Sequence, residues 1–208
     1  MSRLETWNER YAARELVWST GPNQRFAGEA KHLKPGKALD VACGEGRNAL
    51  WLAEQGWSVT AIDFSKVAIE KAKRIAKRRG IELDWMIEDI SRFPLPEQSY
   101  DLVAVNYLHT GIAERARWLV NVVEAVKPLG TFIYIGHDPC NIESGVGGPQ
   151  DPDLLPGIEE LSGALDGFRI DVAMVVERPV VNEPGHGVKL EGIALDSIIR
   201  AVKNMGPG

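Results

Sequence analysis

The hydrophobic positions of the chain alternate between short apolar runs and stretches with helical spacing. Five apolar runs predict strands, at residues 37–42, 57–63, 81–89, 100–108 and 131–137. Three stretches repeat apolar residues every three or four positions and predict helices, at residues 47–56, 66–79 and 113–126. Strands that alternate with helices in this way are typical of a parallel, doubly wound α/β sheet with helices on both faces.

The last third of the chain has a different pattern. Residues 141–157 are rich in glycine and proline and predict a long loop, followed by a short helix over residues 157–165. Residues 168–180 and 188–202 predict two long strands, joined as a hairpin around residues 182–187. The complete pattern is therefore a mostly parallel, seven-stranded sheet that ends in an antiparallel pair.

A chain of 208 residues is expected to form one domain with a full hydrophobic core. Within it, residues 1–36 are an N-terminal segment with one or two short helices, broken at Gly21 and Pro22. Residues 37–136 contain the regular alternation of strands and helices, and residues 137–208 contain the loop and the hairpin. The ligand of such a sheet is expected beyond the carboxyl ends of its first strands.

The composition excludes several classes of protein. No apolar run approaches the roughly 20 residues that a membrane helix needs, and the N-terminus lacks the order of a secretory signal. Two cysteines cannot form a disulfide framework, which favours a cytoplasmic location. The net charge of -5 argues against a nucleic-acid partner. Nothing in the sequence indicates an oligomeric state.

One basic stretch, from Lys71 to Arg79, needs a separate explanation. Six of its nine residues are Lys or Arg, but Ala68, Ala72 and Ala76 recur at helical spacing between them. We therefore expect the alanines to face a core and the basic residues to lie on the solvated side of a helix. Three of them precede Gly80, where cations stabilise a helix C-terminus.

The residues after the first predicted strand indicate a cofactor that contains adenosine. Gly44 and Gly46 begin a G-x-G-x-x-A turn that opens a helix, and Asp63 follows the second strand 19 residues after Gly44. Glycine allows the dihedral angles of such a turn and the close approach of a ligand. A carboxylate at the end of the second strand can accept hydrogen bonds from ribose hydroxyls. These features fit NAD and S-adenosylmethionine equally well.

Three further observations favour S-adenosylmethionine. Asp40 lies inside the first strand, where a carboxylate would suit a cationic cofactor better than the pyrophosphate of NAD. Asp89 follows the third strand and could accept a hydrogen bond from the adenine amino group. The strand over residues 100–108 ends in polar and aromatic residues, which could meet a methyl acceptor.

These residues resemble the motifs of the class I S-adenosylmethionine-dependent methyltransferases. The resemblance covers residues 37–136, where Asp40, Gly44 and Gly46 match the acid-x-x-x-Gly-x-Gly pattern and Ala42 replaces its usual first glycine. The stretch VKPLGTFIYI resembles the entry of this family into its fifth strand, with Leu129 departing from it. The resemblance implies a Rossmann-like methyltransferase fold, S-adenosylmethionine as cofactor and methyl transfer as the activity.

Residues 7–26 are similar to the N-terminal segment of the thiopurine- and tellurite-type small-molecule methyltransferases, in which an aromatic lid covers the cofactor. Their aromatic residues could instead simply bury this segment on the core. Taken together, the residues expected around the cofactor are Asp40, Ala42, Gly44, Gly46, Asp63, Phe64, Asp89, Ile90, Asn106, Tyr11 and Trp18.

The candidates for acid–base chemistry are Tyr107, His109 and His137, which follow the fourth and fifth strands. His109 suits proton acceptance because an unperturbed imidazole has a pKa near 6.5, although it could equally cap a helix. No metal is expected, because Asp138 and Asn141 do not give His137 the spacing of a metal site.

The short N-terminal segment and the loops leave no room for a separate substrate domain, which favours a small-molecule acceptor. The sequence does not identify that acceptor. An NAD(P)-dependent oxidoreductase and a non-catalytic module that binds S-adenosylmethionine remain as alternatives.

Overall fold

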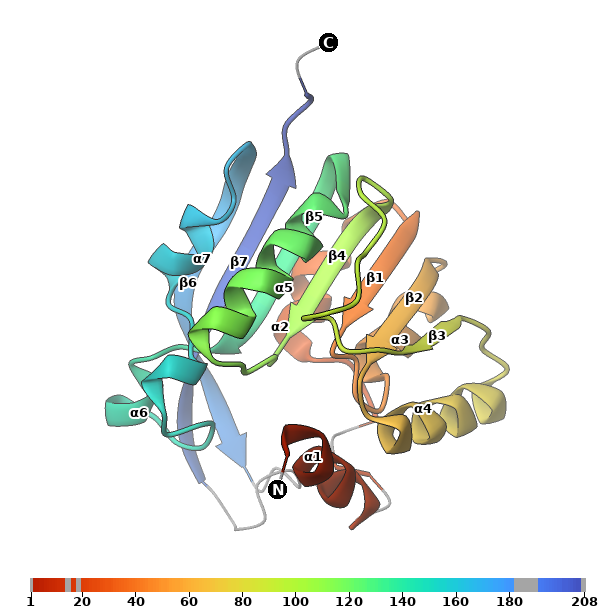
Figure 1. The fold of residues 1–208 in the computed structure, drawn as a ribbon, viewed down its shortest axis with the longest axis horizontal. Helices are drawn as coiled ribbons and strands as arrows, with labels where there is room; N and C mark the ends of the chain where they lie inside the picture. Colours follow the sequence, from red (N-terminus) through yellow and green to blue (C-terminus); the bar gives the residue numbers. More distant parts are fainter. Residues whose placement is uncertain (1, 14–15, 18–19, 182–190, 207–208) are drawn as a thin grey trace.

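Seven strands form one sheet in the order β3-β2-β1-β4-β5-β7-β6 (Figure 1). The computed structural model describes residues 2–13, 16–17, 20–181 and 191–206. The strands are β1 (Lys37–Val41), β2 (Ser58–Asp63), β3 (Asp84–Ile87), β4 (Tyr100–Asn106), β5 (Val126–His137), β6 (Phe168–Val181) and β7 (Glu191–Lys203). The first five pair in parallel, and β7 pairs antiparallel with both β5 and β6. The predicted sheet and its antiparallel end are confirmed.

Helices cover both faces of the sheet. The helices in the described part of the chain are α1 (Arg3–Ala12), α2 (Gln24–Ala30), α3 (Arg47–Glu54), α4 (Lys66–Arg79), α5 (Ile112–Glu124), α6 (Asn141–Ser144) and α7 (Ile158–Gly163). One hydrophobic core joins the sheet to α5 and α7 through residues such as Trp118 and Leu161. A second core joins the opposite face to α2, α3 and α4 through Phe26, Leu52 and Ile69. Among the described residues, no helix combines the length and the apolar character that crossing a membrane requires.

The ends of α4 and the position of β4 follow from their sequences. Ser65 caps the N-terminus of α4 by accepting a hydrogen bond from the backbone N–H of Ala68, and Gly80 ends the helix in the left-handed conformation. The central position of β4 agrees with its apolar sequence, because both faces of a central parallel strand are covered by helices. The predicted hairpin turn, residues 182–187, lies outside the described residues.

The connection from α5 to β5 differs from the prediction. We expected a helix over residues 113–126, with Pro128 and Gly130 after it as the residues that stop it. Instead, α5 ends at Glu124 and β5 begins at Val126. The pairing of β4 with β5 is irregular between Tyr100 and Leu102, so that the Pro128–Gly130 segment is accommodated within the strand. A proline is tolerated at such an irregularity because the regular ladder is already interrupted there.

The loop over residues 141–157 is also more structured than expected. It contains the short helix α6 and a single 3₁₀ turn from Pro152 to Leu154. The side chain of Asn141 holds this segment on β7 by accepting a hydrogen bond from the backbone N–H of Leu195 at 2.7 Å. This anchoring places the loop beside the sheet.

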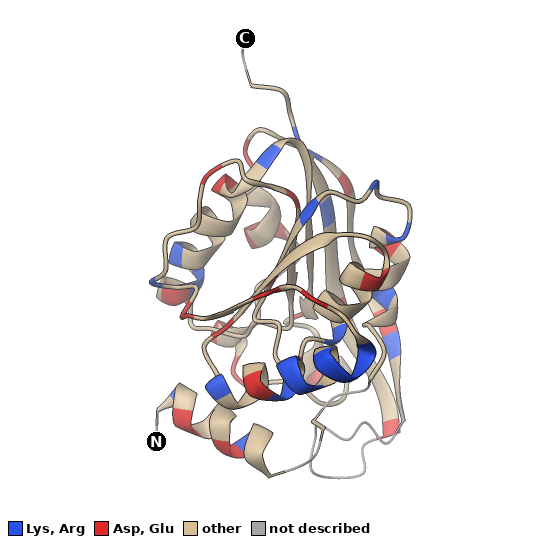
Figure 2. Ribbon diagram, turned by 90° about the vertical axis from the view of Figure 1, so that its right-hand side faces the viewer, with Lys and Arg blue, Asp and Glu red and all other residues tan. Residues whose placement is uncertain are grey.

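The expectation that every basic residue of α4 faces solvent is wrong for Lys71. Its side chain is 11% exposed, and its ammonium group lies 3.2 Å from Glu45 Oε1 and donates to the carbonyl oxygen of Tyr11. Glu45 in turn accepts two hydrogen bonds from the backbone N–H of Val17, at 2.9 and 3.1 Å. Figure 2 shows Lys and Arg gathered along α4. The sequence pattern placed Lys71 with its basic neighbours because it cannot show that an N-terminal segment covers this helix.

The Glu45–Lys71 pair therefore joins the glycine turn, α4 and the N-terminal segment. α1 lies beyond the carboxyl ends of the parallel strands, at the bottom of Figure 1. Two buried hydrogen bonds attach α1 and the residues after it to the rest of the molecule. Lys71 donates to the carbonyl oxygen of Tyr11, and Glu45 accepts from the backbone N–H of Val17.

We predict that Lys71→Met lowers the free energy of unfolding by about 3–5 kcal/mol, because it removes one partner of the buried Glu45–Lys71 ion pair. Urea unfolding measures this change. Lys73→Met is the matched control, because Lys73 lies on the exposed side of the same helix, and it should stay within about 0.5 kcal/mol. The double variant Glu45→Gln/Lys71→Met should lose less stability than Lys71→Met alone. Equal losses for Lys71→Met and Lys73→Met would contradict the role of the pair.

Candidate functional site

A cavity of about 1170 Å³ opens at the carboxyl ends of the parallel strands. Its walls come from α1, α2, the glycine turn, the ends of β2, β4 and β5, and part of β6. The residues predicted around the cofactor that line it are Tyr11, Ala42, Gly44, Asp63, Phe64, Asp89, Ile90 and Asn106. All three acid–base candidates also line it. Trp18 lies outside the described residues.

The glycine turn has the backbone strain that its sequence predicts. Ala42, Gly44 and Gly46 all have positive φ angles, of 54°, 55° and 78°. A Cβ atom on Gly44 would lie 2.7 Å from the hydroxyl oxygen of Tyr11. A Cβ atom on Gly46 would lie 2.7 Å from the ring of Trp85, so that this glycine allows α3 to pack closely and is not itself part of the cavity wall.

Asp63 connects the turn to the beginning of α4. Its Oδ2 accepts a hydrogen bond from the backbone N–H of Gly44, and its Oδ1 accepts one from that of Ser65, both at 2.8 Å. Burial raises the pKa of this carboxyl, and the two N–H donors oppose the rise. The carboxylate is thus fixed in orientation at the edge of the cavity, where its remaining lone pairs can accept hydrogen bonds.

Asp89 follows β3 and lines the cavity. Its Oδ1 accepts a hydrogen bond from the backbone N–H of Ser91 at 3.0 Å. Arg3 of α1 lies 3.9 Å from Asp89 and forms a closer ion pair of 2.6 Å with Glu114 of α5. α1 therefore contacts the same acidic group that the sequence assigned to adenine.

Two predicted cofactor residues have buried polar atoms without hydrogen-bond partners among the described residues. The unpartnered atoms are both carboxylate oxygens of Asp40 and both side-chain amide atoms of Asn106. Asn106 lines the cavity, whereas Asp40 lies behind the glycine turn and does not reach the surface of the cavity. Such groups destabilise a protein unless a ligand or water satisfies them.

Two aromatic side chains of α1 form part of the cavity wall. The rings of Trp7 and Tyr11 are stacked with their centroids 5.6 Å apart, and both line the cavity. Tyr11 is 5% exposed, and it packs with Val17 and Ala68 in a small apolar cluster. The N-terminal segment thus both buries itself and forms a wall of the cavity.

Three ring side chains meet at the opposite end of the cavity. The centroid of the Tyr107 ring lies 5.3 Å from that of His137 and 6.3 Å from that of His109. The two histidine rings are stacked 5.5 Å apart. Tyr107 has a positive φ angle of 53°, a rare conformation for a residue with a side chain, at the point where β4 ends. The structure therefore brings all three predicted acid–base residues together.

Sequence reasoning missed two residues of this group, Asp196 of β7 and Arg178 of β6. Asp196 Oδ2 accepts hydrogen bonds from the hydroxyl of Tyr107 at 2.6 Å and from Nε of Arg178 at 2.7 Å. Its Oδ1 lies 3.2 Å from Nδ1 of His137. Asp196 is fully buried. The signal that could have found it is a charged residue inside the apolar strand IALDSII.

The surroundings of His109 and Tyr107 shift the pKa of each side chain. Burial lowers the pKa of His109 to about 3, and the neighbouring His137 adds to this effect. The expectation that His109 keeps an ordinary imidazole pKa is therefore wrong, and His109 is neutral at physiological pH. Burial and the charge of Asp196 raise the pKa of Tyr107, so that its hydroxyl keeps its proton.

The polar residues after β5 hold the loop in place. Asp138 Oδ2 accepts a hydrogen bond from the hydroxyl of Ser197 at 2.6 Å, and Asn141 donates to the carbonyl oxygen of Gly147 at 2.9 Å. Gly148 then lies against His137, where a Cβ atom would be 2.6 Å from the imidazole ring. Within the described residues, no group of three or more His, Cys, Asp or Glu side chains is arranged to hold a metal ion.

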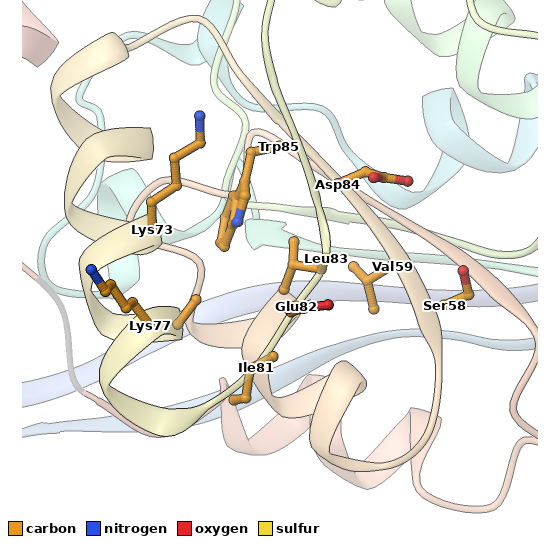
Figure 3. A pocket seen from close by; sticks show the side chains of 10 residues that line it. Ser58, Val59, Lys73, Lys77, Ile81, Glu82, Leu83, Asp84 and Trp85 are labelled. Carbon is orange, nitrogen blue, oxygen red and sulfur yellow. The ribbon is translucent and has the colours of Figure 1, made fainter.

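A second hollow, on the other side of the molecule, has different chemistry. It lies between α4 and β3 and is lined by Trp85, Leu83 and the side chains of Lys73 and Lys77 (Figure 3). Ser58 and Asp84, the first residues of β2 and β3, also line it. The hollow is therefore at the amino ends of the strands, opposite the end at which α/β sheets bind their ligands.

Comparison with known proteins identifies the domain that contains the cavity. Residues 38–130 match the sequence family described as "Methyltransferase domain". The ubiquinone biosynthesis O-methyltransferase of Rickettsia akari is 32% identical over 103 residues, which are 50% of this chain and 41% of that protein. This chain thus spans about two fifths of the length of that relative.

Two further proteins are similar over more of the chain. The 2-heptyl-1-hydroxyquinolin-4(1H)-one methyltransferase of Mycobacteroides abscessus is 29% identical over 160 residues, which are 74% of this chain and 69% of that protein. The solved structure of TehB from Haemophilus influenzae has a TM-score of 0.74 and 18% identity, and the match covers 89% of this chain and 64% of that one. This likeness shows the fold. Residues 38–130 are therefore similar to a methyltransferase domain, and the sheet that contains them has the fold of TehB.

Proposed function

We propose that this protein transfers a methyl group from S-adenosylmethionine to a small-molecule acceptor. The observation that carries the proposal is a single cavity that joins the cofactor residues Asp63 and Asp89 to the ring side chains of Tyr107, His109 and His137. A donor held at one end and an acceptor at the other could react without leaving this space. Alignment of two bound reactants can contribute about 7–11 kcal/mol to catalysis.

The residues of the cavity fit S-adenosylmethionine. The carboxylate of Asp63 can accept hydrogen bonds from ribose hydroxyls, and the carboxylate of Asp89, which lines the same cavity, can accept one from the adenine amino group. The unpartnered amide of Asn106 offers a donor and an acceptor at the end of β4. Asp40, behind the turn, adds a carboxylate near the region where a cationic amino-acid moiety would bind. The bound cofactor would supply a methyl group on a positively charged sulfur, which is a good leaving group.

The size of the cavity and the relatives support a small acceptor. The volume of about 1170 Å³ is near the upper end of ordinary small-molecule sites, and it must hold the cofactor as well. The similar protein of Mycobacteroides abscessus is named for methylation of a quinolone, a small heteroaromatic compound. The α1 helix, with Trp7 and Tyr11 on the cavity, would exclude water from the bound reactants.

We expect S-adenosylhomocysteine and S-adenosylmethionine to raise the midpoint of thermal unfolding, and NAD and NADP to leave it unchanged. A ligand at 100 times its Kd stabilises a protein by about 2.7 kcal/mol, and each kcal/mol moves the midpoint by about 2–4 °C for a domain of this size. A thermal-shift comparison of the four compounds on one preparation tests this. A shift with NAD alone would contradict the proposed function.

We predict that Asp63→Ala weakens the binding of S-adenosylhomocysteine about tenfold to a hundredfold. Each charge-assisted hydrogen bond lost from the ribose is worth roughly 1.5–3 kcal/mol. Isothermal titration calorimetry measures the affinity, and circular dichroism verifies that the variant is folded. Asp84→Ala is the matched control, because Asp84 is an exposed carboxylate at the opposite end of the same sheet. An unchanged affinity in folded Asp63→Ala would remove the ribose assignment.

We also predict that the contribution of Asp40 to the free energy of unfolding falls as the pH rises from about 4 to 7. Burial raises the pKa of this carboxyl to about 7, against about 3.9 in an unfolded chain. In this pH range the folded protein binds a proton that the unfolded chain has released, so the contribution has a slope of up to about 1.4 kcal/mol per pH unit.

Asp40→Asn should remove this contribution and leave that of Asp63, whose pKa is raised in the same direction, and that of His109, whose lowered pKa has the opposite effect on stability. Urea unfolding of the ligand-free protein at several pH values measures both slopes. Equal slopes for the wild type and Asp40→Asn would show that Asp40 is not protonated in the folded protein.

A further inference from the structure

We propose that His137, held by Asp196, accepts the proton of an aromatic hydroxyl group, and that the methyl acceptor is therefore a phenol or a related ring hydroxyl. This inference rests on the proposed function and adds to it the class of acceptor and the residue that takes the proton. It makes His137 a catalytic residue and Asp196 a positioning residue.

The geometry of His137 fits the role of a base. Its Nδ1 lies 3.2 Å from Oδ1 of Asp196, close enough for an ion pair but without the geometry of a hydrogen bond, and its ring lines the cavity. A carboxylate at this distance from Nδ1 favours the tautomer with its proton on that nitrogen. It also stabilises the imidazolium ion that forms when Nε2 takes a second proton.

The neighbouring groups are less suited to this task. Burial and the proximity of His137 lower the pKa of His109 to about 3, so that His109 is a weak base. The hydroxyl of Tyr107 donates to Asp196 and keeps its proton. Of the three candidates that the sequence left open, His137 is the one with a carboxylate partner and a nitrogen directed away from it.

Asp196 can support His137 because it stays ionised in a buried position. Burial alone would raise its pKa, but contacts with His137, Arg178 and Tyr107 together hold the pKa below its ordinary value. Arg178 Nε and the hydroxyl of Tyr107 both donate to Oδ2, at 2.7 and 2.6 Å. The other carboxylate oxygen is left to His137.

The need for a base indicates the acceptor. A neutral amine attacks with its lone pair and needs no base before methyl transfer. A thiol ionises more readily than a phenol, with an unperturbed pKa of about 8.5 against about 10 for tyrosine. A hydroxyl on an aromatic ring gains most from a base at this position. The cavity wall beside the three rings contains Leu108, Pro149, Leu154 and Pro179, which suit a flat apolar ring.

The proton and the electrons balance in this step. The hydroxyl proton passes to His137 Nε2, and the lone pair that remains on oxygen forms the bond to the methyl carbon while the electrons of the broken sulfur–carbon bond stay on sulfur. The products are an aryl methyl ether and S-adenosylhomocysteine. The imidazolium ion, paired with Asp196, then releases its proton to water.

The test uses 4-nitrophenol, because its ionised form absorbs visible light and its protonated form does not. The protein is saturated with S-adenosylhomocysteine at a mildly acidic pH, where most of the free phenol carries its proton. We expect 4-nitrophenol to bind wild-type protein as the phenolate, with a saturable rise in visible absorbance. His137→Gln and Asp196→Asn should lose this rise, and His32→Gln should keep it, because His32 is exposed and lies outside the cavity.

A turnover experiment with S-adenosylmethionine complements the absorbance measurement. His137→Gln should slow the methylation of 4-methylphenol by about 10²–10⁴-fold, the usual contribution of a general base. At mildly alkaline pH it should slow that of 4-nitrophenol far less, because this acceptor is already ionised. An equal loss with both phenols would show that His137 is structural and would overturn the proposal.

The outcomes also separate this proposal from the proposed function. Binding of S-adenosylhomocysteine to His137→Gln and Asp196→Asn, measured by calorimetry, shows that each variant retains its cofactor site. If the wild type binds S-adenosylhomocysteine but binds and methylates no phenol, or methylates thiophenol or aniline instead, the proposed function stands and the hydroxyl acceptor is wrong. If S-adenosylhomocysteine does not bind, the proposed function itself is wrong.

Discussion

The carboxylate of Asp63 holds together the parts of the molecule that form the cofactor end of the cavity. One of its oxygens accepts a hydrogen bond from the glycine turn after β1, and the other accepts one from the backbone of Ser65. Ser65 caps α4, and its hydroxyl also donates to Asn8 of α1 at 2.7 Å. A single buried side chain at the end of β2 thus fixes a turn, a helix start and, through one more bond, the N-terminal helix. The Glu45–Lys71 pair strengthens the same connection from the other side of the turn.

The two ends of the cavity come from different parts of the sheet topology. The cofactor residues follow β1, β2 and β3, which are parallel neighbours whose carboxyl ends meet at one edge. The proposed base follows β5, but its carboxylate partner lies near the beginning of β7. These two residues meet because β7 runs antiparallel to β5, so that its first residues lie at the edge where β5 ends. The antiparallel end of the sheet therefore adds Asp196 to a cavity edge that the parallel strands otherwise form.

The sequence located the side chains that follow the parallel strands better than those that depend on distant packing, for a physical reason. Gly44, Asp63 and Asp89 belong to short motifs in which a strand end and the following turn decide where the side chain lies. Asp196 and Lys71 depend instead on which distant segment packs beside them, and periodicity carries no such information. For the same reason the pattern could name His109 and His137 as candidates, but the burial that lowers the pKa of His109 and the carboxylate beside His137 appeared only in the folded chain. The interrupted start of β5 was missed because Pro128 and Gly130 ordinarily mark the end of an element.

The pairing of β5 with β7 has a consequence for how the chain can change. His137 and Asp196 are direct partners across these two strands, and so their side chains point to the same face of the sheet. Side chains alternate between faces along a strand, so a shift of the pairing by one residue would turn Asp196 to the opposite face and present Leu195 or Ser197 to His137. The hydrogen bonds of the sheet could largely re-form after such a shift, but the carboxylate would be gone from the imidazole. A single-residue insertion or deletion between Asp196 and Val202, the stretch of β7 that pairs with β5, would therefore separate Asp196 from His137, even where the sheet itself could absorb the change.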